Sequence, residues 1–218
     1  MRSLLLLLLT AAPMPPGTIR YLALGDSFTI GTGVDPSRNF PTQLKERLTT
    51  AGKQVTLKNV AVNGYSTAEV IERELLVLKD FKPDLVTLAI GANDAVRKRS
   101  AEDYRQNLKA IFAALRDAGI PATSILVLPQ PNWAASPVGQ SFGSPTETRA
   151  GIEQFNAILA EETKEAGARY LDLWKLFLHE ADLKWFAPDG LHPSARAYTE
   201  WAGELFNAIS RTSETPAP

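Results

Sequence analysis

The stretch Tyr21-Leu22-Ala23-Leu24-Gly25-Asp26-Ser27 joins a short apolar run to a polar turn. The apolar run is typical of a buried β-strand, and Gly-Asp-Ser is typical of the turn that leads out of one. Further apolar runs of strand length follow at 55–60, 85–90, 125–128 and 170–173. Those at 85–90 and 125–128 are nearly continuous, which suits strands covered on both faces. The sequence therefore predicts five strands, the first of which runs directly into Gly25-Asp26-Ser27.

Helical segments separate these strands, and a last helix is expected over 194–209. Two segments fit the capping box that marks a helix N-terminus: Ser66 with Glu69, and Ser144 with Glu147. Three glycines stand where left-handed C-caps would end helices: Gly52, Gly119 and Gly167. Strands and helices that alternate at this spacing predict an α/β protein, in which a parallel sheet carries helices on both faces. Ligands bind such sheets beyond the carboxyl ends of the strands.

The histidine and cysteine counts exclude several kinds of chemistry. The 218 residues hold two histidines, His179 and His192, and no cysteine. Cysteine nucleophiles, disulfides, thiolate zinc sites and His-rich metal centres are therefore excluded. An imidazole base has to be His179 or His192. Lys plus Arg (23) and Asp plus Glu (24) nearly balance, so the charge gives no sign of a nucleic-acid partner or an anionic membrane.

The two ends of the chain differ from the rest. Residues 1–17 combine a basic start, six leucines over 4–9 and small residues at 10–12. This pattern predicts a signal for export to the periplasm or the medium, too short to be an integral membrane span. The alternative is a disordered leader on a cytoplasmic protein. One domain is expected over 18–211, followed by a disordered Ser/Thr/Pro/Glu tail at 212–218.

Four polar clusters lie at strand exits or just before the last helix, at 25–27, 63–64, 91–94 and 189–192. Each alone is ordinary turn chemistry, but together they supply the parts that acyl transfer needs. We expect Ser27 to be the nucleophile, His192 the general base and Asp189 the carboxylate that fixes the imidazole tautomer. The oxyanion would be bound by the N–H groups of Ser27 and Gly64 and by the side-chain amide of Asn93.

The chain resembles the SGNH hydrolase superfamily, also called GDSL-type lipases and esterases. Four blocks in the family's order carry the resemblance: Gly25-Asp26-Ser27-Phe28, Asn63-Gly64, Gly91-x-Asn93-Asp94 and Asp189-x-x-His192-Pro193. The resemblance implies a three-layer α/β/α fold, flavodoxin-like, with five parallel strands. It also implies a Ser27-His192-Asp189 triad and hydrolysis of small-molecule esters or thioesters. It implies no cofactor and no metal.

A second serine motif, Gly139-x-Ser141-x-Gly143, fits the nucleophile elbow of α/β-hydrolases, and the order Ser141, Asp189, His192 suits that fold. The elbow needs a strand directly before the serine, whereas Ser141 lies in a Pro-rich loop well beyond Leu128. We therefore favour Ser27. His179 lies in an amphipathic stretch, which is typical of a partly exposed helix or loop, and is the weaker candidate base.

Two other functions could use the same segments. A flavodoxin-like binding domain would cradle a phosphate or nucleotide with residues 27–29 and Gly31-Thr32-Gly33, and it would need neither Asp189 nor His192. An acyltransferase would use the same triad and pass its acyl group to an alcohol. The basic run at 97–99 is expected to be a solvated face, with contact to an anionic head group as the alternative.

The segment 129–144 is the longest irregular stretch and follows the fourth expected strand. Loops of this length inside a compact domain are usually functional. It carries Trp133 and Phe142, which are our candidates for the wall of an acyl pocket because apolar aromatics suit an acyl or aryl group.

Overall fold

Five parallel strands form one sheet in the computed structural model, which describes residues 17–177 and 185–213. They are β1 (Ile19–Gly25), β2 (Val55–Asn59), β3 (Leu85–Ala89), β4 (Ile125–Val127) and β5 (Arg169–Tyr170). Their order in the sheet is β2-β1-β3-β4-β5, which is the doubly wound order of flavodoxin-like folds. The expected α/β fold with a five-stranded parallel sheet is confirmed.

Helices connect successive strands and cover the sheet. The α-helices are α1 (Ser27–Ile30), α2 (Phe40–Thr50), α3 (Thr67–Glu69), α4 (Leu78–Phe81), α5 (Ala92–Val96), α6 (Ala101–Asp117), α7 (Pro145–Glu165), α8 (Trp174–Phe177) and α9 (Ala195–Ser213). Short 3-10 turns are η1 (Pro36–Arg38), η3 (Leu75–Val77), η4 (Ala122–Ser124), η5 (Trp133–Ala135) and η6 (Gly139–Phe142), and η2 (Val70–Glu74) is a single π-helical turn.

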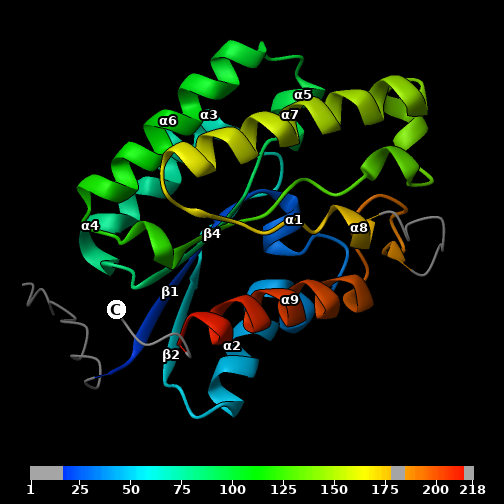
Figure 1. Ribbon diagram of the computed structural model, residues 1–218. Coiled ribbons are helices and arrows are strands. Elements are labelled where there is room, and N and C mark those ends of the chain that lie inside the picture. The colour runs from blue at the N-terminus through cyan, green and yellow to red at the C-terminus, as the bar shows by residue number, and fades with distance from the viewer. Residues whose placement is uncertain (1–16, 178–184, 214–218) are drawn as a thin grey trace, which may run out of the picture.

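Both faces of the sheet are buried, as the alternation of β1 shows. Tyr21 and Ala23 belong to the cluster that packs against α2 and α9, whereas Leu22 and Leu24 belong to the cluster that packs against α6 and α7. Figure 1 shows these helix pairs on opposite sides of the sheet. Successive strand residues point to opposite faces, so a strand covered on both sides has to be apolar throughout. The three-layer arrangement is therefore confirmed.

The expected helix signals are confirmed. Ser66 and Glu69 form a capping box at the start of α3, and the Ser144 hydroxyl accepts a hydrogen bond from the Glu147 N–H at 3.3 Å at the start of α7. The glycines expected at C-caps have left-handed backbones, with φ of +81° at Gly52, +78° at Gly119 and +69° at Gly167.

Some boundaries differ from the expected ones. β4 ends at Val127 and β5 at Tyr170, short of residues 128 and 173. The N–H of Leu171 makes the last bond to the carbonyl of Val127 at 2.9 Å, and Pro129, which lacks an N–H, cannot continue the ladder. α9 runs on to Ser213 rather than ending at 209, because the chain offers no glycine or proline there to stop it.

The leader through residue 16, the tail from 214 and the candidate base His179 lie outside the described residues. The first two residues of the expected tail belong to α9. Within 17–177 and 185–213, no helix is both long enough and apolar enough to cross a membrane.

Candidate active site

The turn from β1 into α1 places Ser27 at the carboxyl edge of the sheet. β1 and β3 are neighbours, with Gly25 opposite Ala89 at their ends. Gly25 has a φ of +149°, and a Cβ there would lie 2.3 Å from the carbonyl oxygen of Ala89. Only glycine fits this backbone and this close approach. The strand therefore ends abruptly, and Ser27 begins the helix.

Ser27 is the first residue of α1 and is 7% exposed. Asp26 caps this helix, because its Oδ1 accepts a hydrogen bond from the Phe28 N–H at 3.0 Å. The first N–H groups of a helix have no acceptor inside it, so the Ser27 N–H is not used by α1. The ring of Phe28 lies 5.5 Å, centroid to centroid, from the imidazole of His192. The residue after the candidate nucleophile is thus in contact with the candidate base.

His192 and Asp189 form a hydrogen-bonded pair on one tight turn. His192 Nδ1 lies 2.7 Å from Asp189 Oδ2, and Asp189 Oδ1 accepts from the N–H groups of Leu191 at 2.9 Å and His192 at 3.0 Å. Burial raises the pKa of Asp189, but these backbone hydrogen bonds and the imidazole outweigh it and hold the pKa below its ordinary value. The carboxylate is therefore the stable form beside the imidazole.

Gly33 allows the Asp189 carboxylate to occupy its position. Its φ is +88°, and a Cβ there would lie 2.7 Å from Asp189 Oδ2 and 2.8 Å from the Cβ of Ala187. The loop after α1 and the loop before α9 therefore meet without a side chain between them, which fixes Asp189 relative to the segment that carries Ser27.

Gly64 and Asn93 lie on neighbouring segments that are joined by hydrogen bonds. Asn93 Nδ2 donates to the Tyr65 carbonyl at 2.8 Å and, more weakly, to Asp26 Oδ2 at 3.4 Å. Gly64 has a φ of +84°, and a Cβ there would meet no atom within 4 Å. Within the described residues the Gly64 N–H has no acceptor. Of these two expected oxyanion donors, the Gly64 N–H is thus unused in the described part of the chain, whereas the Asn93 amide already has two acceptors.

Arg97 connects the segment of Gly64 with that of Asn93. The basic run at 97–99 predicts a solvated face and gives no sign of this contact. The Arg97 guanidinium donates to the Gly64 carbonyl at 2.7 Å and to Glu69 at 2.8 Å. Burial raises the pKa of Glu69, but hydrogen bonds from Ser66 and Arg97 outweigh it and lower the pKa to about 2. Arg97, Lys98 and Arg99 are all exposed, as expected.

Not every predicted contact of the triad is present as a hydrogen bond. In the described residues, neither the Ser27 hydroxyl nor His192 Nε2 takes part in one. Catalytic hydrogen bonds are often long before substrate binds, so this arrangement is compatible with a serine–histidine pair that closes around an ester.

The competing motifs are arranged differently. Ser141 lies in η6 and its hydroxyl donates to the Val138 carbonyl at 2.7 Å, so no strand leads into it. The N–H groups of Gly31 and Thr32 both donate to the Ser27 carbonyl. These groups are therefore already used within the chain and are not free to cradle a phosphate.

The two aromatic pocket candidates lie together. Trp133 is buried and its ring stands edge-on to that of Phe142, with centroids 5.3 Å apart, while Phe142 is 43% exposed. Trp133 also lines a small crevice with Leu191 and Pro193, the two neighbours of His192 in the chain. The segment 129–144 therefore borders the candidate site, with Trp133 packed inside and Phe142 at the surface.

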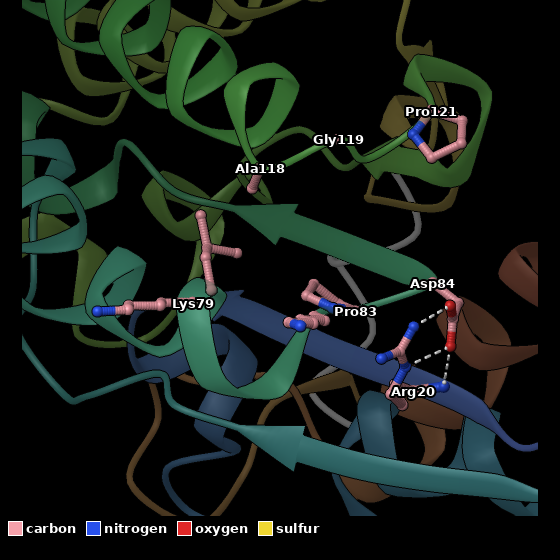
Figure 2. A pocket seen from close by; sticks show the side chains of 9 residues that line it. Arg20, Lys79, Pro83, Asp84, Ala118, Gly119 and Pro121 are labelled. Atoms are coloured by element: carbon pink, nitrogen blue, oxygen red, sulfur yellow. Dashed lines mark hydrogen bonds and ion pairs between the residues drawn. The ribbon is translucent and has the colours of Figure 1, made fainter.

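A separate pocket of about 470 Å³ lies at the other edge of the sheet, at the amino ends of β1 and β3 (Figure 2). There Arg20 donates to Asp84 through Nε at 2.8 Å and Nη2 at 2.6 Å, which holds the pKa of Asp84 below its ordinary value. The nine described residues that line the pocket include no serine and no histidine. It offers no nucleophile–base pair.

Glu74, which the sequence motifs do not single out, is buried beside the nucleophile turn. Its Oε2 accepts a hydrogen bond from the Gly25 N–H at 2.9 Å. The signal in the sequence is a charged residue in an apolar stripe, since Val70, Glu74 and Leu78 are four residues apart and all buried.

Known proteins share both the sequence pattern and the fold. A family model described as the GDSL-like lipase/acylhydrolase family matches residues 23–199. An arylesterase of Vibrio mimicus is 27% identical over 188 residues, which cover 85% of each chain. Thioesterase 1/protease 1/lysophospholipase L1 of Escherichia coli (strain K12) is 25% identical over 196 residues, 89% of this chain and 84% of that one. The crystal structure of TesA superposes with a TM-score of 0.73 at 22% identity and covers 88% of this chain and 98% of that chain.

The match to the family model spans most of the chain and includes all four blocks at Gly25, Asn63, Gly91 and Asp189. The superposition on TesA shows the same fold independently. This chain therefore belongs to the GDSL-like lipase/acylhydrolase family, and it is an ester hydrolase.

Proposed function

We propose that the chain hydrolyses small-molecule carboxylic esters or thioesters through an acyl-enzyme on Ser27. The observation that carries this proposal is the 2.7 Å contact between His192 Nδ1 and Asp189 Oδ2, beside the segment that bears Ser27. A carboxylate that accepts a hydrogen bond from one imidazole nitrogen holds the proton on that nitrogen. The other nitrogen is then unprotonated and can act as a base. The relatives named arylesterase and thioesterase support both kinds of ester.

In the first step the Ser27 hydroxyl oxygen attacks the carbonyl carbon of the ester, and its proton passes to His192 Nε2. Asp189 stabilises the imidazolium that results. The imidazolium then gives this proton to the leaving alcohol or thiol as the bond to the carbonyl carbon breaks. An acyl group remains on Ser27. A water molecule then attacks the acyl carbonyl carbon and gives a proton to His192 Nε2. The imidazolium returns this proton to the Ser27 oxygen as the bond to the acyl group breaks and the acid is released.

The oxyanion of each tetrahedral intermediate would accept hydrogen bonds from the Ser27 N–H, the Gly64 N–H and Asn93 Nδ2. The weak 3.4 Å bond from Asn93 to Asp26 is the one that an oxyanion would replace, since the 2.8 Å bond to Tyr65 holds the amide in place. Donors fixed in advance around a developing charge are usually the largest single contribution to catalysis.

The experiment compares three variants on short and long p-nitrophenyl esters and on an acyl thioester. Ser27→Ala and His192→Ala should each lower kcat by about 10⁴-fold, whereas Ser141→Ala should leave turnover unchanged. Undiminished turnover of Ser27→Ala would overturn the proposal. A loss confined to Ser141→Ala would instead assign the nucleophile to η6. Acyl transfer would show as an ester product when a primary alcohol is added.

A further inference from the structure

Glu74 is a buried carboxyl that the catalytic steps above do not use. It is 2% exposed and ends the π-helical turn η2. Its Oε2 accepts from the Gly25 N–H, while its Oε1 is buried and, within the described residues, has no hydrogen-bond partner. Single π-helical turns inside helices often occur at functional sites. Here the turn directs a carboxyl at the backbone two residues before Ser27.

The bond to Gly25 matters because this N–H lies at the end of β1, where the backbone leaves the sheet with a φ of +149°. A buried N–H without a hydrogen-bond partner destabilises the fold. Glu74 Oε2 supplies that partner across 49 positions of the sequence. The carboxyl therefore holds the start of the turn that presents Ser27.

Glu74 interacts electrostatically with a second buried carboxyl, that of Asp26. Asp26 is 1% exposed, but its two oxygens accept from the Phe28 N–H and from Asn93. Glu74 has a single acceptor bond and an unpartnered oxygen. Two adjacent buried carboxyls cannot both ionise cheaply. When the pair holds a single proton, that proton therefore resides on Glu74, the member whose charge is less solvated.

The electrostatics of the surrounding elements agree with this assignment. Burial, and then the charge of Asp26, raise the pKa of Glu74 to about 8, against the hydrogen bond from Gly25. Burial raises the pKa of Asp26 to about 7. The charge that acts on Asp26 is that of Asp94 of α5, another buried acid. The charge of Asp26 in turn helps to raise the pKa of two buried tyrosines, Tyr104 of α6 and Tyr198 of α9. The guanidinium of Arg97 is bound to Glu69.

We propose that Glu74 is a positioning residue for Ser27: its neutral carboxyl holds Gly25, and loss of its proton in alkaline solution reversibly weakens ester hydrolysis. The inference rests on the proposed role of Ser27. Ionisation would place a second negative charge beside Asp26 with one oxygen unsatisfied, and the turn at Gly25 is the segment that can relieve it by moving.

The test measures kcat and KM from pH 6 to 9.5 with a short p-nitrophenyl ester, corrected for uncatalysed hydrolysis. Above about pH 8, kcat of the wild type should fall toward tenfold per pH unit. Glu74→Gln keeps an oxygen acceptor for Gly25 and cannot ionise, so its kcat should stay level. Glu72→Gln, two residues away and exposed, should behave as the wild type. Glu74→Leu should lower kcat at every pH with little change in KM.

An alkaline decline of the same size in Glu74→Gln overturns the proposal. Wild-type enzyme held at pH 9.5 should recover full rate when returned to pH 7.5, and permanent loss would also count against a reversible ionisation. If Ser27→Ala retains turnover, the proposed function is wrong, but this result says nothing about Glu74. The protonation of Glu74 is then tested by a measurement that does not depend on activity.

The measurement that does not depend on activity is the free energy of unfolding in urea. The pKa of Glu74 is raised in the folded state from 4.5 to about 8, so the folded protein binds the proton more tightly than the unfolded chain. Its contribution is fully present below pH 4.5 and is lost as the pH rises to about 8. Glu74→Gln should therefore gain stability relative to the wild type between pH 5 and 8. A difference that does not change with pH shows that Glu74 is ionised throughout and overturns the proposal.

Discussion

Asn93 and Arg97 lie one helical turn apart at α5 and donate hydrogen bonds to consecutive backbone carbonyls, those of Tyr65 at 2.8 Å and Gly64 at 2.7 Å. The N–H of Arg97 in turn donates to the Asn93 carbonyl at 3.0 Å. The side chain proposed to bind the oxyanion and the backbone proposed to assist it are therefore held at a fixed separation by one helix end.

Removing this link should affect catalysis more than binding. Arg97→Ala frees the Gly64 carbonyl, so the oxyanion donors should lose alignment and kcat should fall about 10- to 100-fold, less than the 10²–10³ typical of losing a donor itself. KM should change little. Arg99→Ala, an exposed arginine of the same basic run, is the control in the same assay. Equal effects of the two variants would show that charge, and not the bond to Gly64, is what matters.

Gly33 should be required for the position of Asp189. In Gly33→Ala the new Cβ would lie 2.7 Å from Asp189 Oδ2, which has to move away from His192. We expect kcat to fall about 10- to 100-fold. Gly52→Ala carries the same backbone strain, with a φ of +81°, but its Cβ would meet no atom within 4 Å. It should cost stability alone. A normal kcat for Gly33→Ala would mean that Asp189 tolerates displacement.

Asp189→Asn should separate the tautomer role of this carboxylate from its role in the turn. Loss of the carboxylate should lower kcat by about 10³–10⁴-fold. The pKa of Asp189 is below its ordinary value of 3.8, so its contribution to stability is present above that pH and is lost as the pH falls through the lowered value. Unfolding of the variant should thus depend less on pH in acid.

The matched control is Asp172→Asn. Asp172 also accepts a backbone hydrogen bond from two residues ahead, from the Trp174 N–H at 3.1 Å, but it contacts no imidazole in the described part of the chain. It should leave kcat unchanged. A similar loss of activity in both variants would assign the effect to the turns and contradict the tautomer role.

A stability prediction lies away from the site, between α6 and α7. Arg105 pairs with Glu162, whose side chain is 4% exposed, and with Glu161 at 2.7 Å. Arg105→Ala leaves the buried Glu162 charge without its partner, so the free energy of unfolding should fall measurably. Activity should be retained.

Arg116→Ala is the comparison for that change, because Arg116 and Asp117 are 75% and 71% exposed at their side chains. Its effect should lie within about 0.5 kcal/mol. Urea unfolding at neutral pH measures both variants. If Arg105→Ala is no more destabilising than Arg116→Ala, the Glu162 carboxylate is stabilised by something other than Arg105.

The features that the sequence determined are those set by short spacing. The alternation of apolar runs with capped helices predicted the parallel sheet, since each signal spans only a few residues. Asp189 and His192 are three positions apart, so a tight turn suffices to join them, and the structure has their hydrogen bond at 2.7 Å. The strand exits at Gly25 and Gly91 indicated the edge of the sheet where the candidate site lies, because parallel strands end on the same side.

Only the tertiary structure decided which residues support that site. Glu74 reaches Gly25 across 49 positions and Arg97 reaches Gly64 across 33, while Gly33 meets Asp189 from the far end of the chain. No local pattern encodes such contacts, since they depend on how the layers pack around the sheet. The charged residues involved have ordinary solvated interpretations in sequence. Burial between those layers is what places Glu74 against the Gly25 N–H instead of in solvent.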